Sequence, residues 1–505
     1  MKKLVTLFMA AGMLLGGLST ANAIDFKAKG QWIVSADFGQ NGDFTGGNGI
    51  TGYDGSQDEF EVEQRFRFQL DAVASESLSG TLYFELGDQR WGNNGNGAAL
   101  GADGNNVIEI KQAYIDWLVP QTDLKLRMGI QGMALPSFTT GSQVFNDDVA
   151  GITASYKFNE NVALTAMWAR PMNDNYAGRN AHGVNNYQQN FLDNVDLFAL
   201  ALPLTFDGVK VTPWAMYGMI GPNAFRNSAN PRNYFDVTGN NAGTSSGNFR
   251  TGMFPAGGPT HGNKLTGYGQ AVWAGITGDI VAFDPFRIAF DFNYGSVAYD
   301  DSSANRSGWL ASLLVEYKMD WVTPGIYGWY GSGDDNDTGN GSERLPFVSV
   351  NNTNNAFSRF AFNGDPNLAR ESAVGLAMPG TWGVGIRAKD VSFVEDLKQC
   401  LYVNLMGGTN SPHMANYLVH TRGLAANSNA IGMDSMYLTT KDYALEVGLV
   451  NTYKIYENLD MVFQAAYVAM WLDKSHKVWG DSLMNGRDDT VRDAWNFNLC
   501  YVYSF

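Results

Sequence analysis

Apolar and polar residues alternate along much of this chain. Between Glu59 and Ala74, apolar residues occupy most even positions, and charged or amide residues occupy most odd positions. The same alternation recurs in 124–132, 286–294 and 459–469. A period of two residues is that of a β-strand with one apolar and one polar face. The chain is therefore predicted to consist mainly of amphipathic strands.

Eighteen such strands are predicted, and a count of sixteen remains an alternative. The connections between them alternate between short and long, and the long ones are rich in Gly, Asn, Asp and Ser. Tight turns on one side and long loops on the other are typical of an up-and-down transmembrane β-barrel. The all-β fold is therefore predicted to be an antiparallel barrel. Its expected strands are 25–38, 59–75, 78–91, 106–119, 123–135, 149–159, 162–171, 195–207, 209–221, 267–281, 286–299, 306–320, 322–334, 380–392, 397–409, 440–456, 459–473 and 493–505.

The N-terminus has the features of a secretory signal peptide. Lys2 and Lys3 precede an apolar run from Leu4 to Leu18, which is followed by the small-residue site Ala21-Asn22-Ala23. Cleavage after residue 23 leaves 24–505 as one barrel domain. A membrane-spanning helix is the alternative, but the run is short and interrupted by glycines. No later apolar run reaches the ~18 residues of a spanning helix, so membrane insertion of the mature chain requires a closed barrel.

Charge and cysteine content add two smaller points. Without Lys2 and Lys3 the chain has 32 basic and 50 acidic residues, a net charge of −18, which argues against a nucleic-acid partner and mildly favours cations as solutes. Cys400 and Cys500 fall on the fifteenth and eighteenth predicted strands, about 14 Å apart, which is too far for a disulfide. Two unpaired thiols are expected.

The C-terminal segment ends on an aromatic residue. Leu499, Tyr501, Tyr503 and Phe505 alternate with smaller or polar residues and are expected to face lipid, whereas Asn496, Asn498, Cys500 and Ser504 are expected to face water inside the barrel. Together with the signal peptide and the strand pattern, this terminus resembles the trimeric general-diffusion porins of Gram-negative outer membranes. The resemblance implies a homotrimer in outer-membrane lipid, passing small hydrophilic solutes. It also implies that the four residues form an assembly signal read by the barrel-assembly machinery.

The same resemblance points to a constriction loop at 136–148. In these porins the loop after the fifth strand folds into the lumen, and it often begins Pro-Glu-Phe-Gly-Gly. Here Ser137 replaces the acid and two threonines replace the glycines, so the match is partial. Asp147 and Asp148 are predicted to supply the acidic side of the constriction. An ordinary external loop is the alternative.

Basic residues are predicted on the wall that faces this loop. Arg65 and Arg67 are expected to point inward near mid-depth, with Lys27, Lys29, Lys125 and Arg127 nearer the periplasmic mouth. A basic wall opposite an acidic loop would create a transverse field, and fixed charges in a pore bias which ions pass. The alternative is that these cations are merely solvated or are paired with Glu61, Glu63 and Glu85.

Patterns for catalysis or a cofactor are not evident. All five histidines lie in predicted loops without metal-site spacing, and no Ser-His arrangement for hydrolysis stands out. The acidic stretch 333–339 resembles a calcium loop, but Leu345 occupies the position of the bidentate Glu. The sequence thus favours a passive channel that is not an enzyme. A solute-selective channel with a binding site and a non-conducting surface barrel, plugged by the loops 222–266 and 335–379, are the alternatives.

Overall fold

The computed structural model describes most of the chain that follows the predicted signal peptide. The predicted signal peptide and most of the long connections lie outside the described residues. The described residues are 24–40, 44, 58–93, 98–100, 108–173, 194–222, 224, 251–256, 265, 267–350, 357–362, 374–375, 377–422, 436–473, 475, 478 and 491–505.

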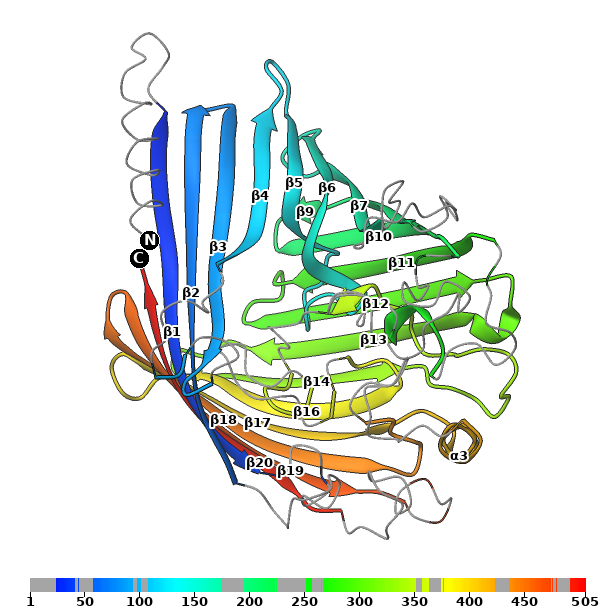
Figure 1. The fold of residues 1–505 in the computed structure, drawn as a ribbon. Helices are drawn as coiled ribbons and strands as arrows, with labels where there is room; N and C mark the ends of the chain where they lie inside the picture. Colours follow the sequence, from blue (N-terminus) through cyan, green and yellow to red (C-terminus); the bar gives the residue numbers. More distant parts are fainter. Residues whose placement is uncertain are drawn as a thin grey trace.

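One antiparallel sheet closes on itself to form a barrel (Figure 1). Neighbouring strands pair in chain order, and the first strand also pairs with the last, so the barrel wall has no free edge. Strands of opposite walls cross steeply in Figure 1, as strong strand tilt requires. The strands are β1 (Asp25–Gln40), β2 (Asp58–Ser75), β3 (Leu78–Arg90), β4 (Glu109–Leu118), β5 (Leu124–Ala134), β6 (Phe145–Lys157), β7 (Ala163–Asn173), β8 (Asn194–Ala201), β9 (Leu204–Phe206), β10 (Val209–Ile220), β11 (Gly269–Ile280), β12 (Phe286–Ala298), β13 (Arg306–Tyr317), β14 (Thr323–Gly331), β15 (Ser349–Val350), β16 (Thr381–Val391), β17 (Leu397–Gly408), β18 (Tyr443–Tyr456), β19 (Leu459–Trp471) and β20 (Ala494–Ser504).

Eighteen strands form the wall, which confirms the predicted fold and settles the strand count. β8 and β9 are two parts of one wall strand, because both pair with β10. The break falls at Pro203, whose nitrogen carries no hydrogen for the ladder. β15 is not a wall strand: it pairs in parallel with the start of β6. Each predicted strand overlaps an observed one, since alternation is a local property of the chain.

The two faces of the wall differ as the alternation predicts. On β13, Trp309, Leu313 and Tyr317 are exposed, whereas Leu310, Ser312 and Glu316 between them are buried. Leu499, Tyr501, Tyr503 and Phe505 are also exposed on the outer face, as expected for side chains that meet lipid. The described helices include none long and apolar enough to cross a membrane.

Part of the barrel interior is packed with apolar side chains. Residues of the inner wall form one buried cluster with residues from connections that turn inward, including Phe254, Phe357 and Phe362. The interior faces of β10 to β14 and of β16 to β20 are largely buried, whereas those of β2 to β5 are mostly half-exposed. The open part of the interior therefore lies along β2 to β5.

The inner face of the last strand corrects one expectation. Asn496, Asn498 and Cys500 point inward, as predicted, but they are buried. The prediction that they face water is therefore wrong. Asn496 and Asn498 donate hydrogen bonds to Asp37 of β1, and Cys500 packs with Ile33 and other apolar residues. Neither Cys400 nor Cys500 forms a disulfide, as expected from their strand positions.

Candidate functional site

The connection between β5 and β6, residues 135–144, turns into the barrel and reaches the opposite wall. Its contacts lie on β11, β12 and β13, far around the barrel from β5. The turn is stabilised locally, because the Ser142 hydroxyl accepts hydrogen bonds from the N–H groups of Val144 (3.3 Å) and Phe145 (3.1 Å). Gly141 has a φ of 81°, a conformation that favours glycine. We call residues 135–144 the inward loop.

Asp291 of β12 binds the tip of the inward loop. Its carboxylate accepts hydrogen bonds from the Ser137 hydroxyl (2.6 Å), the N–H of Phe138 (3.0 Å) and the N–H of Thr139 (3.1 Å). The hydroxyls of Thr139 and of Thr277 on β11 also donate to it. A buried charge that receives several hydrogen bonds is stable without a cation. Asp291 therefore fixes the inward loop against the far wall.

The other side of the inward loop is held by a later part of the chain. The Val144 carbonyl accepts a hydrogen bond from the N–H of Val348 (2.7 Å), which leads into β15. The Gln143 side chain accepts one from the N–H of Met378 (3.3 Å). The loop is thus enclosed between the wall and segments that precede and follow β15.

Asp147 and Asp148 lie on β6, not in a loop as predicted. They pair with Met133 and Gly132 of β5, so their side chains point to opposite faces of the sheet. Asp147 accepts a hydrogen bond from Ser349 of β15 (2.7 Å). Asp148 instead forms an ion pair with Lys111 of β4 (2.7 Å). The structure therefore does not place the two acids together in the lumen.

The predicted basic wall is neutralised by acids on neighbouring strands. Arg65 pairs with Asp88 (2.6 Å) and Arg67 with Glu85 (2.6 Å), both on β3. Among the described residues, neither arginine forms an ion pair with Asp147 or Asp148. The structure therefore does not show a basic wall opposite an acidic loop. It shows ion pairs within one wall, and the pair of Arg67 with Glu85 agrees with the alternative that these cations are neutralised by nearby glutamates.

The four basic residues expected near the periplasmic mouth fall into two groups. Lys125 and Arg127 of β5 both contact Asp116 of β4, at 3.1 Å and 2.7 Å, and Arg127 also lies over the Tyr114 ring, 4.0 Å from its centroid. Lys27 and Lys29 are exposed at the start of β1. The structure brings the first group into one cluster, and Lys27 and Lys29 lie on another strand.

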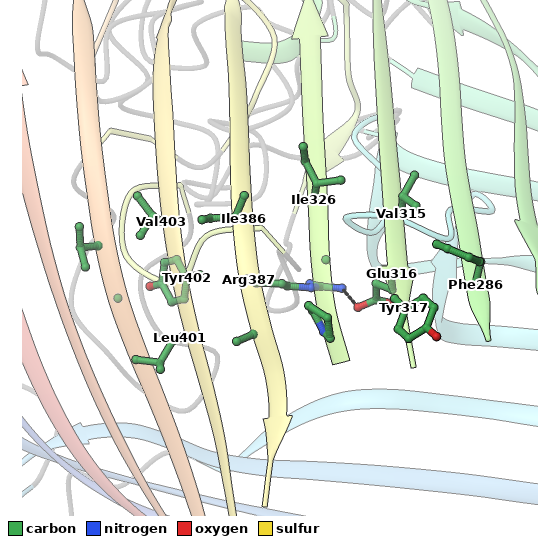
Figure 2. A pocket seen from close by; sticks show the side chains of 15 residues that line it. Phe286, Val315, Glu316, Tyr317, Ile326, Ile386, Arg387, Leu401, Tyr402 and Val403 are labelled. Carbon is green, nitrogen blue, oxygen red and sulfur yellow. Dashed lines mark hydrogen bonds and ion pairs between the residues drawn. The ribbon is translucent and has the colours of Figure 1, made fainter. Parts of the chain in front are cut away.

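A second ionic row lies on the wall that the inward loop contacts. Arg287 of β12 pairs with Asp279 of β11 (2.7 Å) and with Glu316 of β13 (2.9 Å). Arg387 of β16 reaches Glu316 (2.6 Å) across β14, as Figure 2 shows. Gly325 lies between them in the register and leaves room for this contact. Arg287 also donates to the Phe138 carbonyl (3.4 Å), which joins the row to the inward loop.

An apolar groove of about 570 Å³ lies on the outer side of the same strands (Figure 2). Ile326, Ile386 and Leu401 line it and are more than half exposed, so they face away from the lumen. The groove therefore belongs to the lipid-facing wall and not to the candidate site.

Sequence reasoning did not identify Asp291, Glu316, Arg287 or Arg387 as site residues. The alternation of 286–294 does place Arg287 and Asp291 on the polar face. What it lacks is the identity of their partners, since Phe138 and Asp291 are 153 residues apart in the chain. These residues could have been selected from the sequence as inward-facing charges on strands opposite the predicted constriction loop.

Comparisons with known proteins show the fold. No family model matches the chain, and no curated protein matches it by sequence. Among solved structures, the outer membrane protein OprD from Pseudomonas aeruginosa shares 11% identity with a TM-score of 0.50, covering 95% of this chain and 93% of OprD. OccK11 (OpdR) from the same organism shares 12% identity, with a TM-score of 0.48 and coverage of 95% and 96%. OpdL, also from that organism, shares 10% identity, with a TM-score of 0.49 and coverage of 95% and 99%.

These comparisons modify the resemblance noted in the sequence. The chain has the barrel fold of an outer-membrane protein such as OprD over nearly its whole length. The comparisons do not single out the trimeric general-diffusion porins that the sequence resembles. At such low identity the shared feature is the barrel fold, and the chemistry has to be argued from this chain's own residues.

Proposed function

We propose that this protein is a solute-selective channel of the bacterial outer membrane, through which small hydrophilic solutes diffuse passively. The outer face of its barrel is apolar and rich in aromatic residues, as contact with lipid requires. Eighteen-stranded barrels are wide enough to enclose an aqueous passage. Export through the periplasm and insertion by the barrel-assembly machinery, with Leu499, Tyr501, Tyr503 and Phe505 as the assembly signal, are part of this proposal.

The observation that carries the proposal is the attachment of the inward loop to Asp291. A segment that crosses the interior and binds the opposite wall through several hydrogen bonds narrows any passage at that level. Next to it lies the ionic row that contains Arg287. The pairs of Arg65 and Arg67 lie on β2 and β3, in the more open part of the interior. Fixed charges at a narrow point are the means by which channels distinguish solutes.

We favour selective passage over general diffusion because a large part of the barrel interior is filled by protein. Inward-turning segments cover much of the inner wall from β10 onward, and the half-exposed polar surface is concentrated on β2 to β5. A solute following that surface would meet alternating positive and negative groups. Such a surface suits solutes that carry several polar or charged groups better than it suits apolar ones.

Conductance in a planar bilayer tests this function. We expect discrete ohmic steps from the purified protein, and partial block by those small hydrophilic solutes that bind in the channel. Steps without block by any solute in a broad panel would support general diffusion instead. No conductance from a folded barrel would support the non-conducting surface barrel and contradict the proposal. The homotrimer implied by the resemblance predicts that steps occur in groups of three.

A further inference from the structure

A second carboxylate in the barrel interior binds an inward-turning segment from the long connection between β15 and β16. Glu446 of β18 lies on the inner wall and is fully buried. Its carboxylate accepts hydrogen bonds from the Ser358 hydroxyl (3.1 Å) and from the N–H groups of Phe360 (3.3 Å) and Ala361 (3.4 Å). These donors belong to a turn, in which Ser358 also accepts from the N–H of Ala361 (3.0 Å). We call residues 357–362 the aromatic segment.

The wall around Glu446 completes the site. Tyr402 and Asn404, both on β17, donate to the Glu446 carboxylate at 3.1 Å and 2.9 Å. The Asn404 amide also donates to the Phe357 carbonyl (2.7 Å), as does the Tyr327 hydroxyl (3.1 Å). The wall therefore forms hydrogen bonds with the backbone of the aromatic segment at two N–H groups, those of Phe360 and Ala361, and at one carbonyl, that of Phe357.

Aromatic side chains of the wall lie against glycines of neighbouring strands at the place where this segment binds. Tyr327 and Trp329 of β14 lie over Gly385 and Gly383 of β16, where a Cβ atom would come within 2.5 Å and 2.2 Å of their rings. Tyr402 lies over Gly448 of β18 in the same way, at 2.1 Å. The glycines are required here because only they leave room for a ring to lie against the wall. We call Tyr327, Trp329 and Tyr402 the aromatic platform.

The aromatic segment stacks on the platform. The Phe357 ring lies parallel to Tyr327, with centroids 4.3 Å apart and an interplanar angle of 7°. Phe362 meets Trp329 edge-on at 5.6 Å. Such stacked and edge-on pairs stabilise the contact beyond the burial of their area. The chain itself thus covers the rings of Tyr327 and Trp329 inside the barrel.

We propose that the aromatic segment is an internal plug, and that Glu446 is the positioning residue that holds it on the platform. A buried carboxylate is costly unless hydrogen bonds compensate it, and three of the five donors named here come from the plug itself. Weakening this contact would free the plug and widen the passage along β14 to β18. The inference rests on the proposed channel function and adds an element that controls its cross-section.

Two variants test the plug without altering the strand pairing. Ser358→Ala removes one donor and the acceptor that closes the turn. Glu446→Gln keeps the shape of the side chain but removes its charge. The plug donors and Tyr402 share one carboxylate oxygen and Asn404 donates to the other, so the new amide nitrogen would face donors in either orientation and the hold on the plug would weaken. We expect each variant to raise single-channel conductance, by up to about twofold, and to add open–closed transitions that the unmodified protein lacks. Asp196→Asn is the matched control. Asp196 is a buried carboxylate, and its hydrogen-bond partners in the described part of the chain are Trp168, Arg170 and Asn194 of β7 and β8.

The outcomes separate the plug from the channel function. If the unmodified protein and both variants do not conduct although they show the gel mobility of folded barrels, the proposed function fails. If the unmodified protein conducts and the folded Ser358→Ala variant has the same conductance and the same transitions, the plug is refuted, whether or not Glu446→Gln folds. If Asp196→Asn changes conductance as much as the two plug variants, the effect is general to buried carboxylates and the inference is also overturned.

Discussion

The terminal residue Phe505 packs over Gly30 and closes the barrel seam. The N–H of Gly30 donates to the Phe505 carbonyl (2.8 Å), and the N–H of Phe505 donates to the Gly30 carbonyl (3.0 Å). The Phe505 ring covers the space that a side chain at position 30 would fill and lies 6.4 Å and 6.5 Å, between centroids, from Phe66 and Phe68 of β2. The last residue thus spans the first strand and contacts the second.

We therefore predict that Gly30→Ala destabilises the folded barrel. The added Cβ would lie 2.5 Å from the Phe505 ring and 2.8 Å from the Arg67 carbonyl oxygen, so the backbone or the ring has to move. Overpacking of this kind costs about 1–3 kcal/mol. The measurement is the temperature at which the folded band is lost in a heat-modifiability gel. Gly80→Ala is the control, because its nearest neighbour would be 3.9 Å away, and equal melting of the two variants would contradict the prediction.

Deleting Phe505 is expected to reduce the yield of folded barrels more than the conductance of those that fold. The deletion removes two backbone hydrogen bonds and the ring contacts with β2, while the residues lining the interior remain in place. Membrane-inserted yield is compared with single-channel conductance in the same preparation. A normal yield would show that barrel assembly requires neither the packing of Phe505 on Gly30 nor an assembly signal that includes Phe505.

Asp291→Asn is predicted to loosen the inward loop and to increase conductance. The two carboxylate oxygens accept from the N–H groups of Phe138 and Thr139, one each, so an amide nitrogen in place of either oxygen would face a donor. Each buried group left without a partner costs about 1–3 kcal/mol. Asp301→Asn serves as the control, since among the described residues the Asp301 carboxylate accepts hydrogen bonds from Ser303 of its own turn. Unchanged conductance in a folded Asp291→Asn barrel would show that the inward loop does not set the width of the passage.

The strands can be predicted from the sequence because they depend on local alternation, whereas the site cannot because it depends on contacts between distant segments. Alternation is local, so the sequence around Phe286 predicts both a strand and its two faces. The resemblance to the porin constriction loop predicts that Asp147 and Asp148 lie in a loop, yet pairing with Met133 and Gly132 of β5 extends β6 through them.

The contacts that build the site join distant parts of the chain. Glu446 alternates with Leu445 and Val447, so its inward direction follows from the sequence. Its partner Ser358 is 88 residues earlier in the chain, and no periodic pattern specifies that pairing. The sequence therefore predicts which face a charge occupies, and the three-dimensional fold is needed to find what it binds.

Arg67→Ala is predicted to shift the channel towards cation selectivity. The substitution leaves Glu85, which lies 2.6 Å from the Arg67 guanidinium, as an unbalanced negative charge on the interior wall. Glu85→Gln leaves the arginine unbalanced and should shift selectivity towards anions. The reversal potential in a salt gradient measures both. Shifts in the same direction, or no shift in either variant, would show that this pair is remote from the path of the ions.

The connection that follows β14 is predicted to become less stable as the pH rises. Burial and, to a smaller extent, the neighbouring carboxylates of Asp334 and Asp335 together raise the pKa of Glu343 to about 7. The folded state therefore binds the proton more tightly than the unfolded state, whose carboxyl has an ordinary pKa near 4.5. The stabilisation is complete below about pH 4.5 and is lost as the pH rises through about 7. Hydrogen exchange of residues 333–343 should be slower at pH 5 than at pH 8, after correction for the intrinsic rate. Glu343→Gln, which cannot ionise, should remove this difference, and faster exchange at pH 5 in the unmodified protein would reverse the assignment.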